Sequence, residues 1–174
     1  MGYSTGGLIL KNAARLTDND ILVAARRETF SRTEPVGISD ASSESFRATA
    51  IGRVGDMAFV FNKDIPHGCS FEEYDLSKMD ERLAALSTGG DILCFLINDN
   101  SATYAYSIFQ EGARVRAMST AAGMDISDFG KDTGYESNKP GKVANMMEVI
   151  DKFIGQSFME LTAENNIQAT AYYK

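Results

Sequence analysis

Three strand-length apolar stretches lie between positions 91 and 118 and are separated by short polar turns. They occupy residues 91–97, 102–109 and 113–118. The turns are Asn98-Asp99-Asn100-Ser101 and Glu111-Gly112, and turn formers of these types between apolar runs are typical of hairpins. The pattern predicts a three-stranded antiparallel meander over residues 91–118.

Further strands are indicated before and after the meander. Residues 47–54 and 57–61 flank Gly55-Asp56, a two-residue loop whose leading glycine suits a type II′ hairpin turn. A short apolar run begins at Leu8, and residues 167–173 alternate at period two, as a half-buried strand does. These elements predict a sheet that is mainly antiparallel.

Two helices are indicated in the first half of the chain. The first begins near Asp18, although its run Ile21–Ala25 fits a strand as well, because periodicity alone does not decide so short a stretch. The second is predicted over residues 75–86, with Asp75 as its N-cap. Tyr74 and Met79 have the spacing of a hydrophobic staple around this cap.

A third helix is predicted over residues 142–154, where an apolar face is wide and Gly155 supplies a stop signal. So wide a face must lie against the sheet or a partner chain. Together the elements predict one α+β domain of residues 1–174: a mainly antiparallel sheet with about three helices packed chiefly on one face.

Two stretches show neither helix nor strand periodicity: residues 31–46, which hold Pro35 and several serines, and residues 120–142. The second is the more informative. An irregular connection longer than about 12–15 residues is uncommon inside a compact domain and is usually a functional loop or a linker. Residues 120–142 are therefore predicted to be a long irregular loop with a role beyond folding.

The chain is acidic, with 17 Lys and Arg against 24 Asp and Glu residues and a formal net charge of −7. This charge argues against a nucleic-acid partner, because phosphate binding needs a basic surface. No apolar run approaches the roughly 20 residues that span a bilayer, and the N-terminus does not indicate a signal peptide. Two cysteines are too few for a disulfide framework. We therefore expect a cytoplasmic protein with reduced thiols and no membrane contact.

His67-Gly68-Cys69 places a titratable nucleophile and a base close together in the sequence. A thiolate nucleophile needs a base within hydrogen-bond reach and a third group to orient that base, and Glu72 or Glu73 is the candidate. Catalytic Cys and His are, however, normally brought together by the fold. An ordinary surface turn is the favoured interpretation, and a single histidine also argues against a zinc site.

Carboxylates recur in the irregular segment every three or four residues, at Asp125, Asp128, Asp132 and Glu136. With Ser127, Thr133 and Asn138 they form a set of oxygen ligands of the type that Ca²⁺ or Mg²⁺ prefers. The alternation of an EF-hand loop is missing. Solvated loop acids are the favoured interpretation, and no metal is predicted.

The meander places two arginines at period two. With a two-residue turn at Glu111-Gly112, Ile108 is expected opposite Val115, and the first loop is expected to place Phe95 opposite Tyr104. Arg114 and Arg116 then project from one face, beside Ser107 and Cys94, where they would bind a carboxylate or phosphate bidentately. The favoured alternative is that both arginines cover the sheet edge and pair with acids of the loop.

The sequence favours a non-enzymatic protein-interaction or regulatory module that recognises a partner protein, or a second copy of itself, through residues 120–142 and the adjacent sheet face. Both acidic and apolar side chains in this segment suit such contacts. No catalytic residue and no cofactor is predicted. The alternative is a small-ligand binder or enzyme with a pocket under the same segment, lined by Arg114, Arg116, Ser107 and Tyr106. The candidate ligand-binding residues are Tyr104, Tyr106, Ser107, Arg114, Arg116, Asp125, Asp128, Phe129 and Tyr135.

Overall fold

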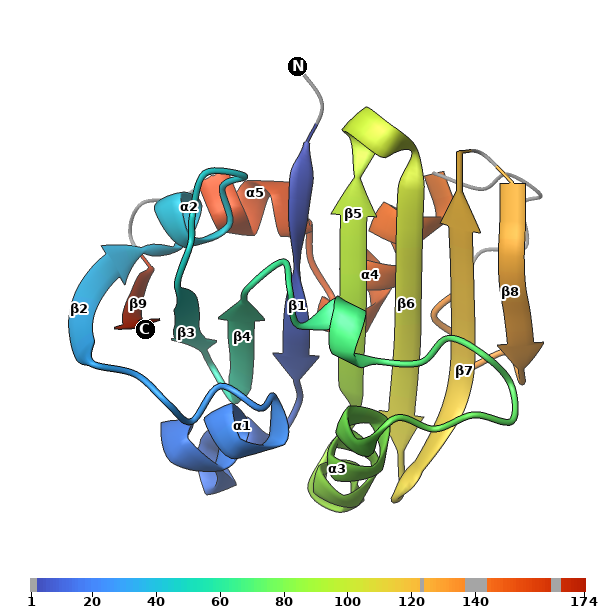
Figure 1. Cartoon of the computed structure of the whole chain (residues 1–174), viewed down its shortest axis with the longest axis horizontal. Coiled ribbons are helices and arrows are strands. Elements are labelled where there is room, and N and C mark those ends of the chain that lie inside the picture. Colours follow the sequence, from blue (N-terminus) through green and yellow to red (C-terminus); the bar gives the residue numbers. More distant parts are fainter. Residues whose placement is uncertain (1–2, 123, 137–143, 164–166) are drawn as a thin grey trace.

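Nine strands form one antiparallel sheet in the computed structural model (Figure 1), which describes residues 3–122, 124–136, 144–163 and 167–174. The strands are β1 (Ser4–Leu10), β2 (Arg32–Gly37), β3 (Thr49–Val54), β4 (Met57–Phe61), β5 (Ile92–Asn98), β6 (Thr103–Gln110), β7 (Ala113–Ala121), β8 (Met124–Gly130) and β9 (Gln168–Tyr173). Their order across the sheet is β2-β9-β3-β4-β1-β5-β6-β7-β8. The predicted α+β class with a mainly antiparallel sheet is confirmed.

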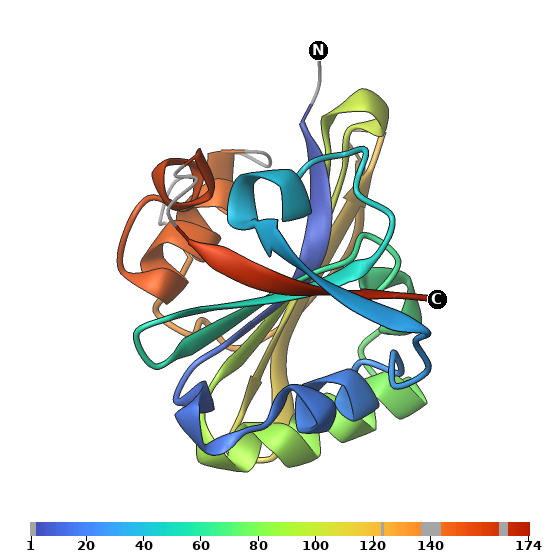
Figure 2. The same cartoon turned by 90° about the vertical axis from the view of Figure 1, so that its left-hand side faces the viewer.

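Helices cover both faces of the sheet (Figure 2). The helices of the described residues are α1 (Asp18–Ala24), α2 (Ile38–Ala41), α3 (Lys78–Leu86), α4 (Ala144–Ile154) and α5 (Phe158–Ala163), with short 3-10 turns η1 (Ala13–Arg15), η2 (Pro66–Gly68), η3 (Ser87–Gly89) and η4 (Asp99–Ser101). Side chains of α2, α4 and α5 join one core cluster, and those of α1 and α3 join the other.

The expectation of about three helices chiefly on one face is therefore corrected: the described residues form five helices, divided between the faces. The reason lies in the central strands. Leu8 and Leu10 belong to one core cluster and Ile9 to the other, and all three are fully buried. A strand that is apolar on both sides needs cover on both faces.

The predicted meander is present as β5, β6 and β7, but its registers differ from the expected ones. Phe95 lies opposite Tyr106, not Tyr104. A shift of two residues keeps each side chain on its predicted face. Between β6 and β7 the change is larger, because Phe109 pairs with Arg114 whereas Ile108 pairs with Arg116. Val115 is the extra residue of a β-bulge, and the bulge sends Arg114 and Arg116 to opposite faces of the sheet.

The prediction of an irregular loop over residues 120–142 is wrong for its first half. Strand β7 continues to Ala121, and β8 pairs antiparallel with it as the last strand of the sheet. Residues 131–136 have no regular structure apart from isolated bends, and 137–142 lie outside the described residues. β8 was not predicted because its side chains are exposed or half-buried on both sides. Burial therefore imposes no alternation of apolar and polar residues on its sequence.

Local signals place several other elements. Thr17 caps α1 in a capping box with Asp20, as the helix predicted near Asp18 requires. Val54 pairs with Met57 around Gly55, whose φ of +59° fits the predicted hairpin turn. Gly155 follows α4 with a φ of +76°, in agreement with its role as a stop signal. The predicted start of this helix at Lys142 lies outside the described residues.

Two other boundaries need correction. Helix α3 begins at Lys78 with Ser77 as N-cap, because the Ser77 hydroxyl accepts from the Asp80 amide while the Asp80 carboxylate accepts from the Ser77 amide. The predicted staple is absent, since Tyr74 is 92% exposed. Residues 31–46 are not wholly irregular, because they contain β2 and α2. Among the described residues, no helix has the length and apolarity needed to cross a membrane.

Candidate functional site

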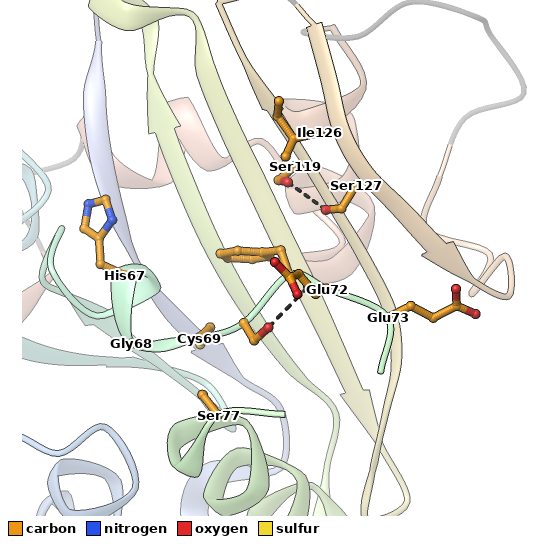
Figure 3. Close-up of a pocket in the computed structure, with 11 residues that line it drawn as sticks. His67, Gly68, Cys69, Glu72, Glu73, Ser77, Ser119, Ile126 and Ser127 are labelled. Atoms are coloured by element: carbon orange, nitrogen blue, oxygen red, sulfur yellow. Dashed lines mark hydrogen bonds between the residues drawn. The ribbon is translucent and has the colours of Figure 1, made fainter. Parts of the chain in front are cut away.

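A segment without regular secondary structure, residues 69–77, crosses in front of β5, β6 and β7 on its way from η2 to α3 (Figure 1). We call this segment the strap. Between the strap and the β7–β8 hairpin lies a cavity of about 750 Å³, the strap pocket (Figure 3). Its lining residues are His67, Gly68, Cys69, Ser70, Phe71, Glu72, Glu73, Ser77, Ser119, Ile126 and Ser127.

A buried ion pair holds the strap in place. Arg114 Nη1 lies 3.4 Å from Asp80 Oδ2, and both side chains are almost fully buried, at 1% and 0% exposure. The Asp80 carboxylate accepts hydrogen bonds from the amides of Ser70 and Ser77, at 2.7 and 2.9 Å. The Arg114 guanidinium donates to strap carbonyls, including those of Ser70 and Glu72. The pair thus supplies hydrogen-bond partners for backbone groups at both ends of the strap.

Arg114 also connects the strap to the edge of the sheet. Its guanidinium carbon lies 4.7 Å from the centre of the Phe129 ring, a cation–π contact with β8. On the same face of the hairpin, the hydroxyls of Ser119 and Ser127 are 2.6 Å apart. These contacts fix β8 and the strap relative to each other, so the pocket between them has a preformed wall on each side.

The open part of the strap pocket is acidic and partly apolar. Glu72 and Glu73 are exposed on the strap, and Figure 3 shows Glu73 pointing away from the cysteine side of the pocket. Ile126 of β8 lines the opposite wall, and its side chain is 64% exposed, as is that of Met124 at the start of the strand. The site therefore combines carboxylates with exposed apolar side chains.

The geometry does not support a Cys–His nucleophile. His67 is exposed and turned away from Cys69 in Figure 3, and no hydrogen bond to its imidazole is present among the described residues. Cys69 Sγ lies 3.4 Å from Cys94 Sγ instead. The hydrogen bond with Cys94, together with burial, raises the pKa of the Cys69 thiol, which is opposite to the shift that activates a nucleophile.

Arg116 belongs to a separate network on the other face of the sheet. Its Nε lies 2.5 Å from Glu136 Oε1, and its Nη1 donates to the Asp128 carboxylate. The Tyr106 hydroxyl donates to the same Glu136 oxygen at 3.0 Å. The expected pairing of an arginine with acids of the 120–142 segment is thus found for Arg116, whereas Arg114 pairs with Asp80 of α3.

The ionisation of this network follows from its contacts. Burial alone would raise the pKa of Glu136, but hydrogen bonds from Arg116 and the Thr133 amide outweigh it and lower the pKa to about 2. Burial raises the pKa of the Tyr106 hydroxyl. Glu136 and Arg116 therefore stay charged, and Tyr106 neutral, across the physiological pH range. Arg116 thus forms ion pairs with two carboxylates of the 120–142 segment.

The structure does not bring Arg114, Arg116, Ser107 and Tyr106, the residues predicted to line the alternative pocket, together on one face of the sheet. The bulge at Val115 separates the two arginines. Ser107 pairs with Cys94 and is fully buried, with no hydrogen-bond partner for its Oγ among the described residues. Tyr106 belongs to the core cluster on the opposite face of the sheet, the face that α2, α4 and α5 cover.

The remaining candidate residues are dispersed. The Tyr104 hydroxyl donates to Asp99 at 2.8 Å, and the Tyr135 hydroxyl donates to Asp91 at 3.1 Å. Asp125 is exposed on β8. Among the described residues no group of three or more His, Cys, Asp or Glu side chains is arranged to hold a metal ion. Asn138, one of the oxygen ligands considered, lies outside them.

The strap and the role of Asp80 were not predicted from the sequence. One local signal was available, because Ser77 and Asp80 have the spacing of a capping box, which marks the true start of α3. No local signal shows that Asp80 is buried against Arg114, a partner 34 positions away. Neither protein-family models nor curated proteins nor solved structures give a match to this chain.

Proposed function

We propose that the chain is a non-enzymatic interaction module that binds an extended, basic segment of a partner protein as an added strand at β8. The observation that carries the proposal is that β8 is a terminal strand of the sheet and lies beside the strap pocket. A terminal strand has backbone N–H and C=O groups along its outer edge with which another chain can pair.

The two edges of the sheet differ in how they are protected. The opposite edge strand, β2, contains Pro35, which removes a backbone donor, and an ion pair between Arg32 and Glu34. β8 contains neither proline nor lysine. Its bulge and two aspartates are its edge protection, yet Met124 and Ile126 remain 64% exposed. Proteins usually guard an edge against pairing, so a weakly guarded one favours a binding role.

The strap pocket gives the proposed site a way to distinguish partner segments by their side chains. In strand addition, main-chain hydrogen bonds contribute affinity and pockets for alternate side chains contribute specificity. Ile126 and Ser127 belong both to β8 and to the pocket wall. A long side chain of an added strand can therefore reach over β8 into the pocket.

Charge favours a basic partner over a second copy of the chain. Glu72 and Glu73 of the strap line the pocket beside β8. Asp125 and Asp128 are exposed on β8 itself, Asp128 in an ion pair with Arg116. Two β8 strands paired with each other would bring four aspartates into one short ribbon, and like charges on adjacent strands are destabilising. A partner segment with Lys or Arg would be attracted to the same carboxylates, and its encounter would be steered by them.

The test is selection of peptides from a randomised display library on the full-length protein. We expect enriched sequences that contain Lys or Arg together with strand-forming residues. N-methylation of alternate backbone amides in a selected peptide should abolish binding, while N-methylation of the intervening amides should not, because only one set pairs with β8.

Matched variants locate the site. Ile126→Lys removes an apolar contact and repels a basic peptide, so binding should weaken by at least about tenfold, or roughly 1.4 kcal/mol. Met159→Lys replaces an exposed apolar side chain on α5, outside the site, and this variant should bind as the wild type does. Equal binding by the two variants, or indifference to the position of N-methylation, would overturn the proposal. A wild-type dimer that Ile126→Lys dissociates would instead identify the partner as a second copy.

A further inference from the structure

We propose that Cys69 and Cys94 form a reversible intrachain disulfide by exchange with a low-molecular-weight disulfide. Cys69 is the attacking thiol, and Cys94 is the resolving thiol. The inference is independent of strand addition at β8, because it rests on different residues and is measured without a binding partner.

The two sulfur atoms are already close. Their separation is 3.4 Å, and both cysteines are free thiols. A disulfide bond is about 2.05 Å long, so the atoms must approach by a further distance of about 1.4 Å. The residues are 25 positions apart in the chain, and the fold thus brings two distant thiols into contact.

The two thiols differ in access. Cys94 lies in β5, fully buried and flanked by Leu8 of β1 and Ser107 of β6. Cys69 is half-buried and lines the strap pocket. A small disulfide entering this cavity of about 750 Å³ meets Cys69 first, because Cys69 lines the cavity whereas Cys94 is fully buried behind it.

The two thiols also differ in how firmly they are held. Cys94 is fixed by strand pairing on both sides of β5. Cys69 is the first residue of the strap, a segment that is anchored at Ser70 through Asp80 and has no strand pairing of its own. The shift that closes the sulfur–sulfur distance is therefore expected in the strap, and it moves one wall of the pocket.

The chemistry needs no oxidant beyond the small disulfide itself. The Cys69 thiol loses its proton to water and its sulfur attacks one sulfur of R–S–S–R, which breaks that bond and releases R–S⁻. The Cys94 thiol then loses its proton and attacks Sγ of the mixed disulfide, which releases the second R–S⁻. Both leaving thiolates take up protons. Two protein thiols are oxidised, and one small disulfide is reduced to two small thiols.

The surroundings make the first step slow at neutral pH. The groups that face Cys69 are Cys94 from β5 and Asp80 from α3, and with burial they raise the pKa of its thiol. Because the thiolate is the nucleophile, the rate should increase with pH. The slow first step sets the rate of oxidation, whereas the reduction potential of the pair against the small disulfide sets how much of it is oxidised at equilibrium.

The experiment uses the full chain, reduced and freed of reductant, and then incubated with oxidised glutathione. Acid quenching, alkylation and intact-mass measurement report free thiols and retained glutathione. We expect the wild type to lose both thiols without keeping an adduct. Cys94→Ala cannot resolve the mixed disulfide and should retain one glutathione, at least about tenfold more than the wild type does, because the resolving thiol has a high effective concentration in the folded state.

Cys69→Ser is the matched control, and its buried Cys94 should remain an unmodified thiol. Circular dichroism on each variant checks that the fold is kept. The proposal is overturned if the wild type retains the adduct as Cys94→Ala does. It is equally overturned if Cys94→Ala stays unmodified, because Cys69 is then not accessible. Disulfide-linked dimers in place of the intrachain bond would also contradict it.

Discussion

Arg114 and Asp80 form a buried ion pair, 3.4 Å apart and almost free of solvent, that holds residues 69–77 against the sheet. Each partner also bonds strap backbone groups, Arg114 through carbonyls and Asp80 through amides. The pair, more than any apolar contact of the exposed strap residues, positions one wall of the strap pocket. A buried pair of this kind is costly to break from one side.

Arg114→Met should lower the free energy of unfolding by about 3–5 kcal/mol, because Asp80 is left as an uncompensated buried charge. Arg32→Met removes an ion pair from the surface, where the Arg32 and Glu34 side chains are 60% and 45% exposed. That change should cost less than about 1 kcal/mol. Urea unfolding of the two variants measures the contrast, and similar costs would show that the Arg114 pair does not anchor the strap.

Glu136 makes stability depend on pH in the acid range. Its folded-state pKa of about 2 lies below its ordinary value of 4.5, so its contribution is present above pH 4.5 and is lost as the pH falls towards 2. Glu136→Gln cannot titrate and should show a shallower loss of stability over that window. Urea unfolding at a series of pH values measures both slopes. Parallel curves would argue against the Arg116–Glu136 contact.

Gly130, at the end of β8, is required by both its backbone angle and its surroundings. Its φ is +97°, and a Cβ atom there would lie 2.2 Å from the Val115 carbonyl oxygen. Gly134 has a φ of +81° with open space around it. Gly134→Ala should cost about 1 kcal/mol from backbone strain alone. Gly130→Ala should cost a further 1–3 kcal/mol or so from the clash.

Amide hydrogen exchange gives a local readout for the same pair of variants. In Gly130→Ala we expect faster exchange in β8, whose pairing with β7 ends at this glycine. In Gly134→Ala the exchange of β8 should be unchanged. Equal stability of the two variants would mean that β8 does not end against Val115.

Ser77, and not Asp75, should behave as the N-cap of α3. Ser77→Ala removes the hydroxyl that accepts from the Asp80 amide at 3.0 Å, and should cost about 1 kcal/mol. Asp75→Ala changes an exposed strap side chain and should stay within about 0.5 kcal/mol of the wild type. Thermal or urea unfolding measures both. The reverse order would place the start of the helix at Asp75.

The features that could be predicted from the order of residues are local ones. Gly55 turns the β3–β4 hairpin and Thr17 caps α1, because a positive φ and a side-chain cap depend on neighbouring residues only. Burial leaves a pattern of apolar residues in the sequence, and this pattern is visible in the apolar runs of the meander and in the alternating apolar and polar residues of β9. These features were sufficient to predict the fold class.

Tertiary structure alone decided the site. β8 is a strand because β7 offers it an edge, and an exposed edge strand has no burial pattern to read. The bulge at Val115 follows from pairing between strands, and it alone separates the faces of Arg114 and Arg116. The contacts Arg114–Asp80 and Cys69–Cys94 join residues 34 and 25 positions apart. The spacing of apolar residues in the sequence indicates which positions are buried, but it does not indicate which distant residue each of them contacts.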